Sequence, residues 1–255
     1  MRMLHSPITA TEPIERKNNY MPSVIQQIRL ELKESADEAV RQSGLRFFKE
    51  PVGLYGVKSA VVTRIAKSRF KDIKHFDKRT IFGLCDELWI SGYLEETGIA
   101  CHWAYSVRKF YEPSDIAIFE RWIHDHVSNW AACDTLCNHT VGAFVEQFPD
   151  ALKKLKRWAR SENRWMRRAA AVSLIIPARN GKFLNDIFEI AEILLTDTDD
   201  LVQKGYGWML KAASESHPGD VFDFVMKKKE SMPRTALRYA IEKLPKDKRA
   251  LAMAK

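Results

Sequence analysis

Apolar side chains recur at helical spacing along almost the whole chain. The clearest runs are Val24, Ile25, Ile28 and Leu32, then Ile81, Leu84 and Leu88, then Ile116, Phe119 and Ile123. This spacing places apolar side chains on one face of a helix, whereas a half-buried strand requires alternation with a period of two. No stretch of the sequence sustains that alternation. The pattern therefore predicts an all-α fold from Pro22 onward.

Helix-breaking residues fall between these apolar runs. They lie at 51–53, 112–114, 148–150, 217–219 and 232–233, and each of these positions includes a proline. Proline lacks the N–H group that a helix interior needs, so these positions end helices. We expect roughly twelve to fourteen helices of about 12–16 residues each, joined by short turns.

Short helices joined by short turns favour helical hairpins stacked as a solenoid. Trp130, Arg168 and Trp208 stand 38 and 40 positions apart, close to the ~40–47-residue period of HEAT and armadillo repeats. The spacing predicts a HEAT-like helical-repeat solenoid (an α–α superhelix), and a compact bundle without repeats is the alternative. Residues 1–20 are expected to form a disordered tail, which leaves residues 21–255 as a single domain.

The chain is basic, with 41 Lys and Arg against 33 Asp and Glu, a net charge of +8 and a pI near 9.3. Such a surplus favours a polyanionic partner, either nucleic acid or an anionic membrane surface. No apolar run approaches the ~20 residues of a membrane-spanning helix, and the first residues lack the apolar segment of a signal peptide. The four cysteines do not indicate a disulfide framework, so a reducing cytoplasm is expected.

One predicted helix begins with a tryptophan and carries an aspartate one turn later. Trp130 and Asp134 are separated by four positions, so both lie on the same face. An indole ring and a carboxylate both favour positive charge, so the pair suits a cationic substrate. The alternative is a buried tryptophan beside an exposed aspartate that interacts with the helix dipole.

Two further segments combine basic and aromatic residues. Arg164, Arg167 and Arg168 form a cluster suited to phosphate, although a solvated cationic face is equally compatible with it. Lys204, Trp208 and Lys211 follow helical spacing, and a helix face with two lysines around an indole suits nucleic acid better than a core. Gly205 and Gly207 lie in this same helix and each cost about 1 kcal/mol there, which indicates close approach of another helix or a ligand.

A metal site is not expected. Cys133, Cys137 and His139 are close in sequence, yet no CxxC pair and no fourth ligand accompany them. Structural zinc sites normally combine four such ligands. Glycine-rich phosphate loops and the G-x-S-x-G nucleophile motif are also missing from the sequence.

Three segments, in their order and spacing, resemble the AlkD-type DNA alkylation repair family. They are N-W-x-x-C-D-T from Asn129, W-x-R-R-A from Trp165, and Q-K-x-x-G-W-x-L-K from Gln203. Residues 55–58 and 233–243 also resemble the family, so the resemblance covers roughly residues 21–245. It implies a HEAT-like solenoid that curves around duplex DNA. It also implies hydrolysis of the N-glycosidic bond of N3- and N7-alkylated purines, the first step of base excision repair.

Carried over residue by residue, the resemblance implies a catalytic set. Asp134 matches the family's catalytic aspartate, Trp130 and Trp208 match its active-site tryptophans, and Arg168 matches its DNA-contacting arginine. The other DNA-binding candidates are Arg167, Lys204, Lys211, Lys58 and Arg234. Lys211 replaces an arginine of the family, which keeps the charge but loses bidentate geometry. The implied partner is double-stranded DNA that contains alkylated purines, bound by a monomer.

The chemistry of such a lesion is compatible with a single carboxylate. A purine alkylated at N3 or N7 is already cationic, so it leaves as a neutral base without a general acid. One carboxylate then stabilises the oxocarbenium-like sugar and orients the attacking water, with no metal or cofactor. Two other interpretations remain. One is a non-catalytic protein that recognises bent or branched DNA and does not need Asp134, and the other is a helical-repeat scaffold for protein partners.

Overall fold

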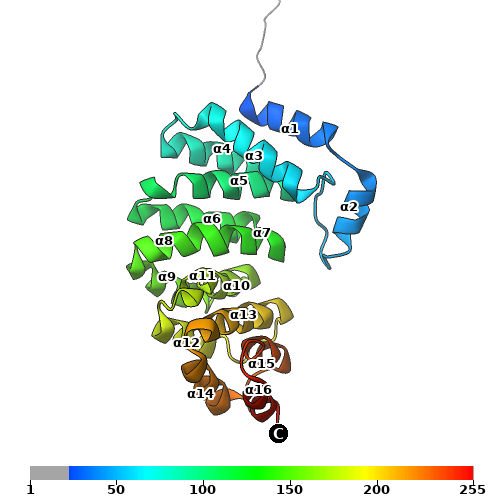
Figure 1. The fold of residues 1–255 in the computed structure, drawn as a ribbon. Coiled ribbons are helices and arrows are strands. Elements are labelled where there is room, and N and C mark those ends of the chain that lie inside the picture. Colours follow the sequence, from blue (N-terminus) through cyan, green and yellow to red (C-terminus); the bar gives the residue numbers. More distant parts are fainter. Residues whose placement is uncertain (1–22, 255) are drawn as a thin grey trace, which may run out of the picture.

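The computed structural model describes residues 23–254, which form helices, turns and one isolated parallel β-bridge between Gly53 and Tyr93. Figure 1 shows the helices stacked in tiers along one long axis, with α1 at one end and α16 at the other. The described range contains no strand, so the predicted all-α helical-repeat solenoid is confirmed. The tail predicted for residues 1–20 lies outside this range. None of the described helices is long and apolar enough to span a membrane.

Six helices follow one another along the stack, and each contacts the next. They are α3 (Ser59–Ile73), α5 (Leu94–Ser106), α7 (Trp130–Thr135), α10 (Arg164–Val172), α13 (Asp200–Ser216) and α15 (Arg234–Ala240). We call these six helices the first row. Because they succeed one another tier by tier, equivalent positions on neighbouring helices lie side by side.

A second row of helices covers the first. It consists of α4 (Lys78–Ile90), α6 (Ile116–His126), α9 (Leu152–Trp158), α12 (Leu184–Ile193) and α14 (Pro218–Lys228). Within the stack, α4 packs against α5, α9 against α10, and α12 against α13. The remaining α-helices are α1 (Val24–Glu34), α2 (Glu38–Leu45), α8 (Gly142–Gln147), α11 (Ile175–Arg179) and α16 (Lys246–Met253).

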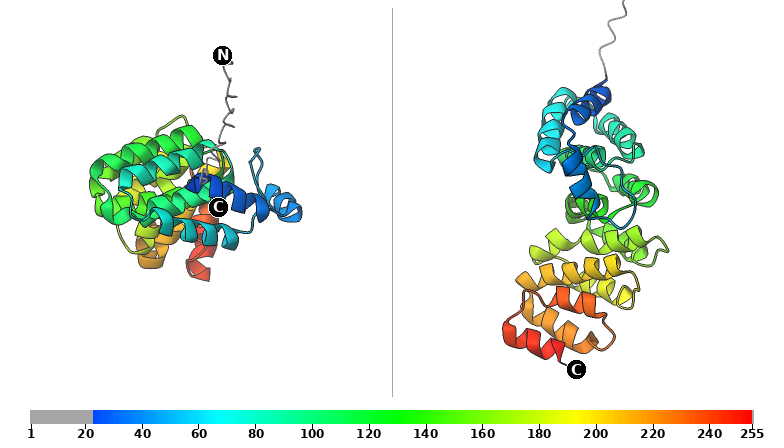
Figure 2. Two further views of the ribbon diagram at one scale, coloured as in Figure 1. Left: turned by 90° about the horizontal axis from the view of Figure 1, so that it is seen from above. Right: turned by 90° about the vertical axis from the view of Figure 1, so that its right-hand side faces the viewer.

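The helix α2 stands apart from the stack, as the left view of Figure 2 shows. None of its residues is buried. A long connection, residues 46–58, leads from α2 back to the first row, and we call it the α2–α3 loop. The loop returns alongside α2, since the N–H of Asp37, the N-cap of α2, donates to the carbonyl oxygen of Gly56 at 3.1 Å.

The described residues form sixteen α-helical segments of 5 to 17 residues, most of them shorter than the sequence predicted. Apolar periodicity continues across several breaks, so it does not detect them. A turn at Ser173 and Leu174 separates α10 from α11 inside a continuous apolar run. A π-helical turn, Leu136–Val141, separates α7 from α8 within one uninterrupted helical stretch.

The first-row helices begin at a regular interval. Their N-cap residues are separated by 35, 36, 34, 36 and 34 positions, and they are Lys58, Tyr93, Asn129, Asn163, Asp199 and Pro233. Three of these residues (Asn129, Asn163 and Asp199) each accept a hydrogen bond from a first-turn backbone N–H at 2.9 Å. Such caps satisfy donors that a helix start leaves without partners.

This interval corrects the longer period predicted from sequence. Trp130, Arg168 and Trp208 are the first, fifth and ninth residues after their N-caps. Each step between them therefore spans one repeat plus about one helical turn of 3.6 residues. The three residues belong to one surface but do not occupy equivalent positions.

Candidate active site

The fifth residue after each N-cap forms a line along the first row. Asp134 in α7, Arg168 in α10 and Lys204 in α13 occupy this position. The Nε and Nη2 groups of Arg168 donate to Oδ1 and Oδ2 of Asp134 at 2.8 and 2.7 Å. The Nη1 group donates to the carbonyl oxygen of Leu201 in α13. Arg168 thus joins three successive first-row helices and holds both oxygens of one carboxylate.

A cavity of about 500 Å³ opens beside this pair. Its size lies within the range of roughly 300–1,000 Å³ that is typical of small-molecule sites. Six of the residues predicted from sequence line it together: Trp130, Asp134, Arg168, Lys204, Trp208 and Lys211. The other lining residues are Phe47, Lys49, Glu50, Arg164, Asp200, Leu201 and Tyr239. We call this cavity the cleft.

The side chain of Trp130 forms part of the cleft wall and is held by the α2–α3 loop. Its Nε1 group donates to the carbonyl oxygen of Phe47 at 3.3 Å. Its ring stacks on Phe48, with centroids 5.6 Å apart and planes inclined by 23°. The indole of Trp208 is likewise half-buried against the core and lines the cleft. Two indoles are therefore available to pack on a flat cationic group.

The carboxylate of Asp134 is mostly buried but can still accept hydrogen bonds. Its side chain is 13% exposed, against 6% for the side chain of Arg168. Burial raises the pKa of the Asp134 carboxyl, and the Arg168 guanidinium opposes that rise. Each carboxylate oxygen accepts one bond from Arg168 and keeps a further lone pair. Asp134 is thus held in a fixed orientation with acceptor capacity left for a substrate or a water.

The charge of the cleft lining is positive. Five lining residues are cationic (Lys49, Arg164, Arg168, Lys204 and Lys211) and three are anionic (Glu50, Asp134 and Asp200). Lys204 pairs with Asp200 at 2.7 Å, and Lys211 pairs with Glu242 at 2.9 Å. The carboxylate of each pair is exposed to solvent, and ion pairs in contact with solvent are weak, so a phosphate can compete for either ammonium group.

Three predicted DNA-binding residues do not line the cleft. The guanidinium of Arg167 is bonded to Asp197, with Nε to Oδ2 at 2.6 Å, and to the carbonyls of Ser161 and Glu162. Lys58 lines a separate, largely apolar cavity of about 760 Å³. Arg234 lines a third cavity beside α16. Their roles in DNA binding stay predictions, and the guanidinium of Arg167 is already engaged by its partners within the chain.

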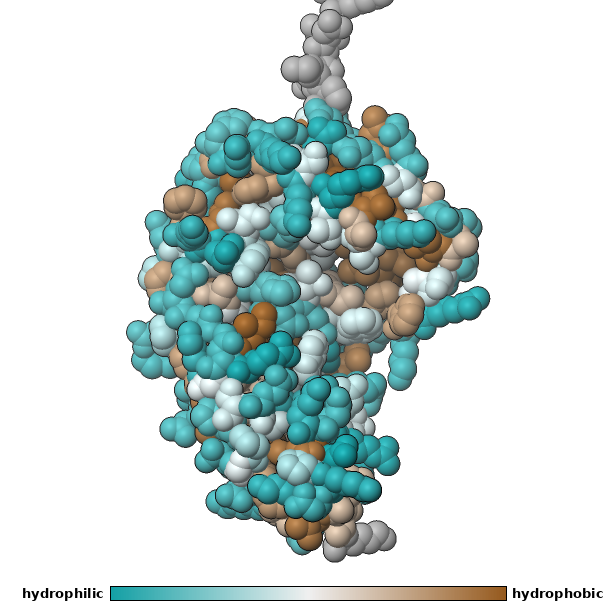
Figure 3. All heavy atoms as spheres, in the orientation of Figure 1, coloured by the Kyte–Doolittle hydropathy of each residue, from teal (hydrophilic) through white to brown (hydrophobic). Residues whose placement is uncertain are grey.

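The apolar cavity is larger than the cleft and shares Phe47 and Trp130 with it. Figure 3 shows hydrophobic residues gathered in a hollow on this side of the molecule. Its lining holds no cation–carboxylate pair comparable to Arg168 and Asp134. We therefore place the chemistry in the smaller cleft.

The α2–α3 loop contributes residues to the cleft that the sequence did not predict. Phe47, Lys49 and Glu50 line the cleft although they precede Trp130 by about eighty positions. No local pattern indicates this contact. Arg164, the first residue of α10, also lines the cleft, and the regular spacing of the N-caps would have placed it beside Trp130 and Asp200, the equivalent residues of α7 and α13.

The candidate metal ligands do not form a site. Cys133 and Cys137 are buried, and burial raises the pKa of the Cys133 thiol well above its ordinary value. Among residues 23–254 there is no group of three potential ligands suited to a metal ion.

A family model described as "DNA alkylation repair enzyme" matches residues 28–244. This range includes every residue that lines the cleft. The chain belongs to this family. The resemblance inferred from the three sequence segments is thereby confirmed.

A solved structure with the same fold was also found. It is described as a predicted DNA alkylation repair enzyme from Enterococcus faecalis, and it superposes with a TM-score of 0.75 at 15% sequence identity. The match covers 83% of this chain and 98% of the other. A search of curated proteins gave no significant match.

Proposed function

We propose that the protein is a DNA glycosylase that releases cationic N3- and N7-alkylated purines from duplex DNA. The observation that carries the proposal is the Asp134 carboxylate, buried and clamped by Arg168 in a cleft with two tryptophans and a cationic lining. Membership in the DNA alkylation repair family supports it.

The reaction requires from the protein a carboxylate near the sugar and side chains that hold the base. The bond between C1′ and N9 of the purine breaks, and its electron pair leaves with the base, which becomes neutral. Asp134 faces the developing positive charge on the sugar, and a water adds to C1′ while its proton passes to the carboxylate or to solvent. Trp130 and Trp208 pack on the cationic base, each worth about 0.5–2 kcal/mol. Arg168 acts as a positioning residue for Asp134.

The proposed partner is DNA bound by a single copy of the protein. Lys204 and Lys211 lie at the cleft, where each can exchange its carboxylate for a backbone phosphate. We place the activity in the cytoplasm, since all four cysteines are free thiols and a reducing compartment keeps them so.

The test is release of free base from duplex DNA that contains N7-methylguanine or 3-methyladenine. Wild type should release base, and Asp134→Asn should be slower by at least about 10²–10³-fold, because one preorganised electrostatic contact is worth about 3–4 kcal/mol. Trp208→Ala should be milder, because it removes contact area and leaves the charge.

The pairing of Asp134 with Arg168 requires a check that the Asp134→Asn variant is folded. An amide at position 134 turns an N–H group toward Arg168, so the substitution leaves a buried cation partly unpaired. Thermal unfolding must therefore be measured alongside excision. Asp186→Asn is the matched control, because Asp186 pairs with Lys156 at 2.8 Å outside the cleft.

Two results would overturn the proposal. If folded Asp134→Asn excises as fast as wild type, the carboxylate is not catalytic. If wild type binds duplex DNA tightly but releases no base, the protein is a non-catalytic reader of DNA shape.

A further inference from the structure

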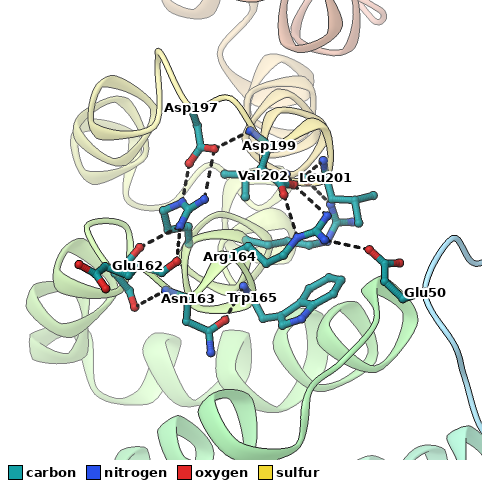
Figure 4. A network of polar contacts seen from close by, with 12 residues as sticks. Glu50, Glu162, Asn163, Arg164, Trp165, Asp197, Asp199, Leu201 and Val202 are labelled. Carbon is teal, nitrogen blue, oxygen red and sulfur yellow. Dashed lines mark hydrogen bonds and ion pairs between the residues drawn. The ribbon is translucent and has the colours of Figure 1, made fainter.

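The tip of the α2–α3 loop is tied to the stack by one carboxylate. Oε1 of Glu50 accepts a hydrogen bond from Nη1 of Arg164 at 2.8 Å, across 114 positions of sequence. Figure 4 shows Glu50 reaching from the loop toward this guanidinium. Among the described residues, this is the only ion pair between residues 46–52 and the rest of the chain.

Arg164 connects this tip to two first-row helices. It is the first residue of α10, and it pairs with Asp199, the N-cap of α13, through Nε to Oδ2 at 2.8 Å and Nη2 to Oδ1 at 3.2 Å (Figure 4). It also precedes Arg168 by one helical turn, on the same face of α10. The loop is thus anchored one turn from the side chain that holds Asp134.

The same loop segment fixes Trp130. The Phe47 carbonyl accepts the indole N–H, and the Phe48 ring stacks on the indole. The other end of the loop is anchored independently, because the buried carboxylate of Glu95 accepts three backbone N–H bonds from residues 55–57 at 2.9–3.1 Å. Loss of the Glu50 contact would therefore remove the ion pair between the tip and the stack and leave the base of the loop in place.

We propose that Glu50 is a positioning residue for base excision. By pairing with Arg164 it holds Phe47 and Phe48 against Trp130, and so fixes the indole that packs on the damaged base. It pairs with Arg164 through Oε1, and we assign its effect to the loop because the carboxylate that we place at the sugar is that of Asp134. The expected effect on the excision rate rests on the proposed glycosylase function. The expected effect on the position of Trp130 rests on geometry alone.

The structural arm of the test does not depend on activity. The protein is labelled with fluorotryptophan, which gives one fluorine resonance for each of its seven tryptophans, and Trp130→Phe and Trp208→Phe assign two of them. Glu50→Gln should shift or broaden the Trp130 resonance and leave the Trp208 resonance unchanged. Glu192→Gln is the control, because it removes a carboxylate paired with Lys228 at 2.8 Å outside the cleft. An unchanged Trp130 resonance in Glu50→Gln overturns the proposal.

The kinetic arm measures single-turnover release of N7-methylguanine. Glu50→Gln should lower the rate about 10-fold, less than the roughly 10²-fold effect of a full 1 Å displacement, because Trp130 keeps its place in α7 and only the contacts of its ring with the loop are loosened. Affinity for undamaged duplex should stay equal or rise, since a negative charge is removed. Phe48→Leu and Glu50→Gln should combine less than additively, because both act through Trp130.

The possible failures are distinguishable. If Glu50→Gln excises at the wild-type rate or faster, Glu50 only neutralises Arg164 and the proposal is wrong. If wild type itself releases no base, the glycosylase function fails, while the fluorine spectra still decide whether Glu50 positions Trp130.

Discussion

At the scale of single residues, two opposing effects act on the Asp134 carboxyl. Burial raises its pKa, and the bidentate pair with Arg168 opposes the rise. Because the folded state binds this proton more readily than the unfolded chain, the carboxyl contributes less to the free energy of unfolding as pH rises above about 3.9. Catalysis has the opposite dependence, because only the ionised form stabilises the sugar cation.

The pH dependence of excision follows from this balance. The single-turnover rate should fall on the acid side with an apparent pKa above the ordinary value of about 3.9 for aspartate. Arg168→Gln removes the opposing charge, so the acid limb should move to higher pH. Base release from the same DNA without protein corrects for spontaneous depurination. An acid limb that moves down in Arg168→Gln would contradict the assignment.

The three arginines of α10 show what the sequence alone does not predict. Arg164, Arg167 and Arg168 are equivalent as a charge pattern. In the structure their partners are Glu50 and Asp199 for the first, Asp197 for the second, and Asp134 for the third. Arg164 and Arg168 lie on one face of α10, and Arg167 points about 100° away from Arg168. The neighbouring segments then determine which carboxylate each arginine meets. The sequence around the three arginines therefore does not predict which carboxylate each one pairs with or what each one does.

At the scale of elements, α13 illustrates how a helix tolerates two glycines for different reasons. A Cβ at Gly207 would lie 2.7 Å from Cβ of Tyr239 and 2.8 Å from the carbonyl oxygen of Ala236, both in α15. A Cβ at Gly205 would lie 3.4 Å or more from the Arg168 and Val172 side chains. The expected close approach of another helix thus applies at Gly207.

The two glycines make a matched pair of variants. Gly207→Ala should lower the free energy of unfolding by about 1–3 kcal/mol, because α15 must move away. Gly205→Ala should be neutral or stabilising by up to about 1 kcal/mol, because alanine has the higher helix propensity. Urea denaturation of both variants measures the difference. Equal stability of the two would show that α15 does not pack closely on α13.

Helices and their class were predictable from the sequence, whereas the repeat interval was not. The apolar runs and prolines identify an all-α stack, because they depend on local spacing. The interval of 34 to 36 positions is carried by N-caps of different chemistry, from Asn129 to Pro233. A cap is defined by backbone geometry, so residues as unlike as these do not reveal the repeat.

At the scale of the whole molecule, the line of fifth residues continues to the last first-row helix. Arg238 occupies this position in α15, after Lys204 in α13, and it is exposed. We therefore expect Arg238 to contact the backbone of the same bound duplex, beyond the cleft. The DNA-binding residue predicted from the sequence in this helix is Arg234, the first residue after the N-cap.

Salt dependence measures this contact. Wild-type affinity for duplex DNA should fall steeply with salt, and Arg238→Gln should reduce the slope of log K against log salt by about 1. Arg249→Gln is the control, since Arg249 is exposed on α16 outside the first row. A slope in Arg238→Gln equal to that of wild type would place the DNA elsewhere.

The pairing of Glu50 with Arg164 has a consequence for how the chain acquires its structure. Repeat stacks consist mainly of contacts between neighbouring units, so they fold progressively from one unit to the next. During synthesis the amino-terminal part emerges first, and the loop tip is made 114 positions before its partner. The early tiers should therefore assemble while the loop is still unattached, and the cleft should close only when α10 and α13 have been added. Ribosome-bound chains arrested before and after residue 200 should differ in protease cleavage at residues 46–52, with protection only in the longer chain.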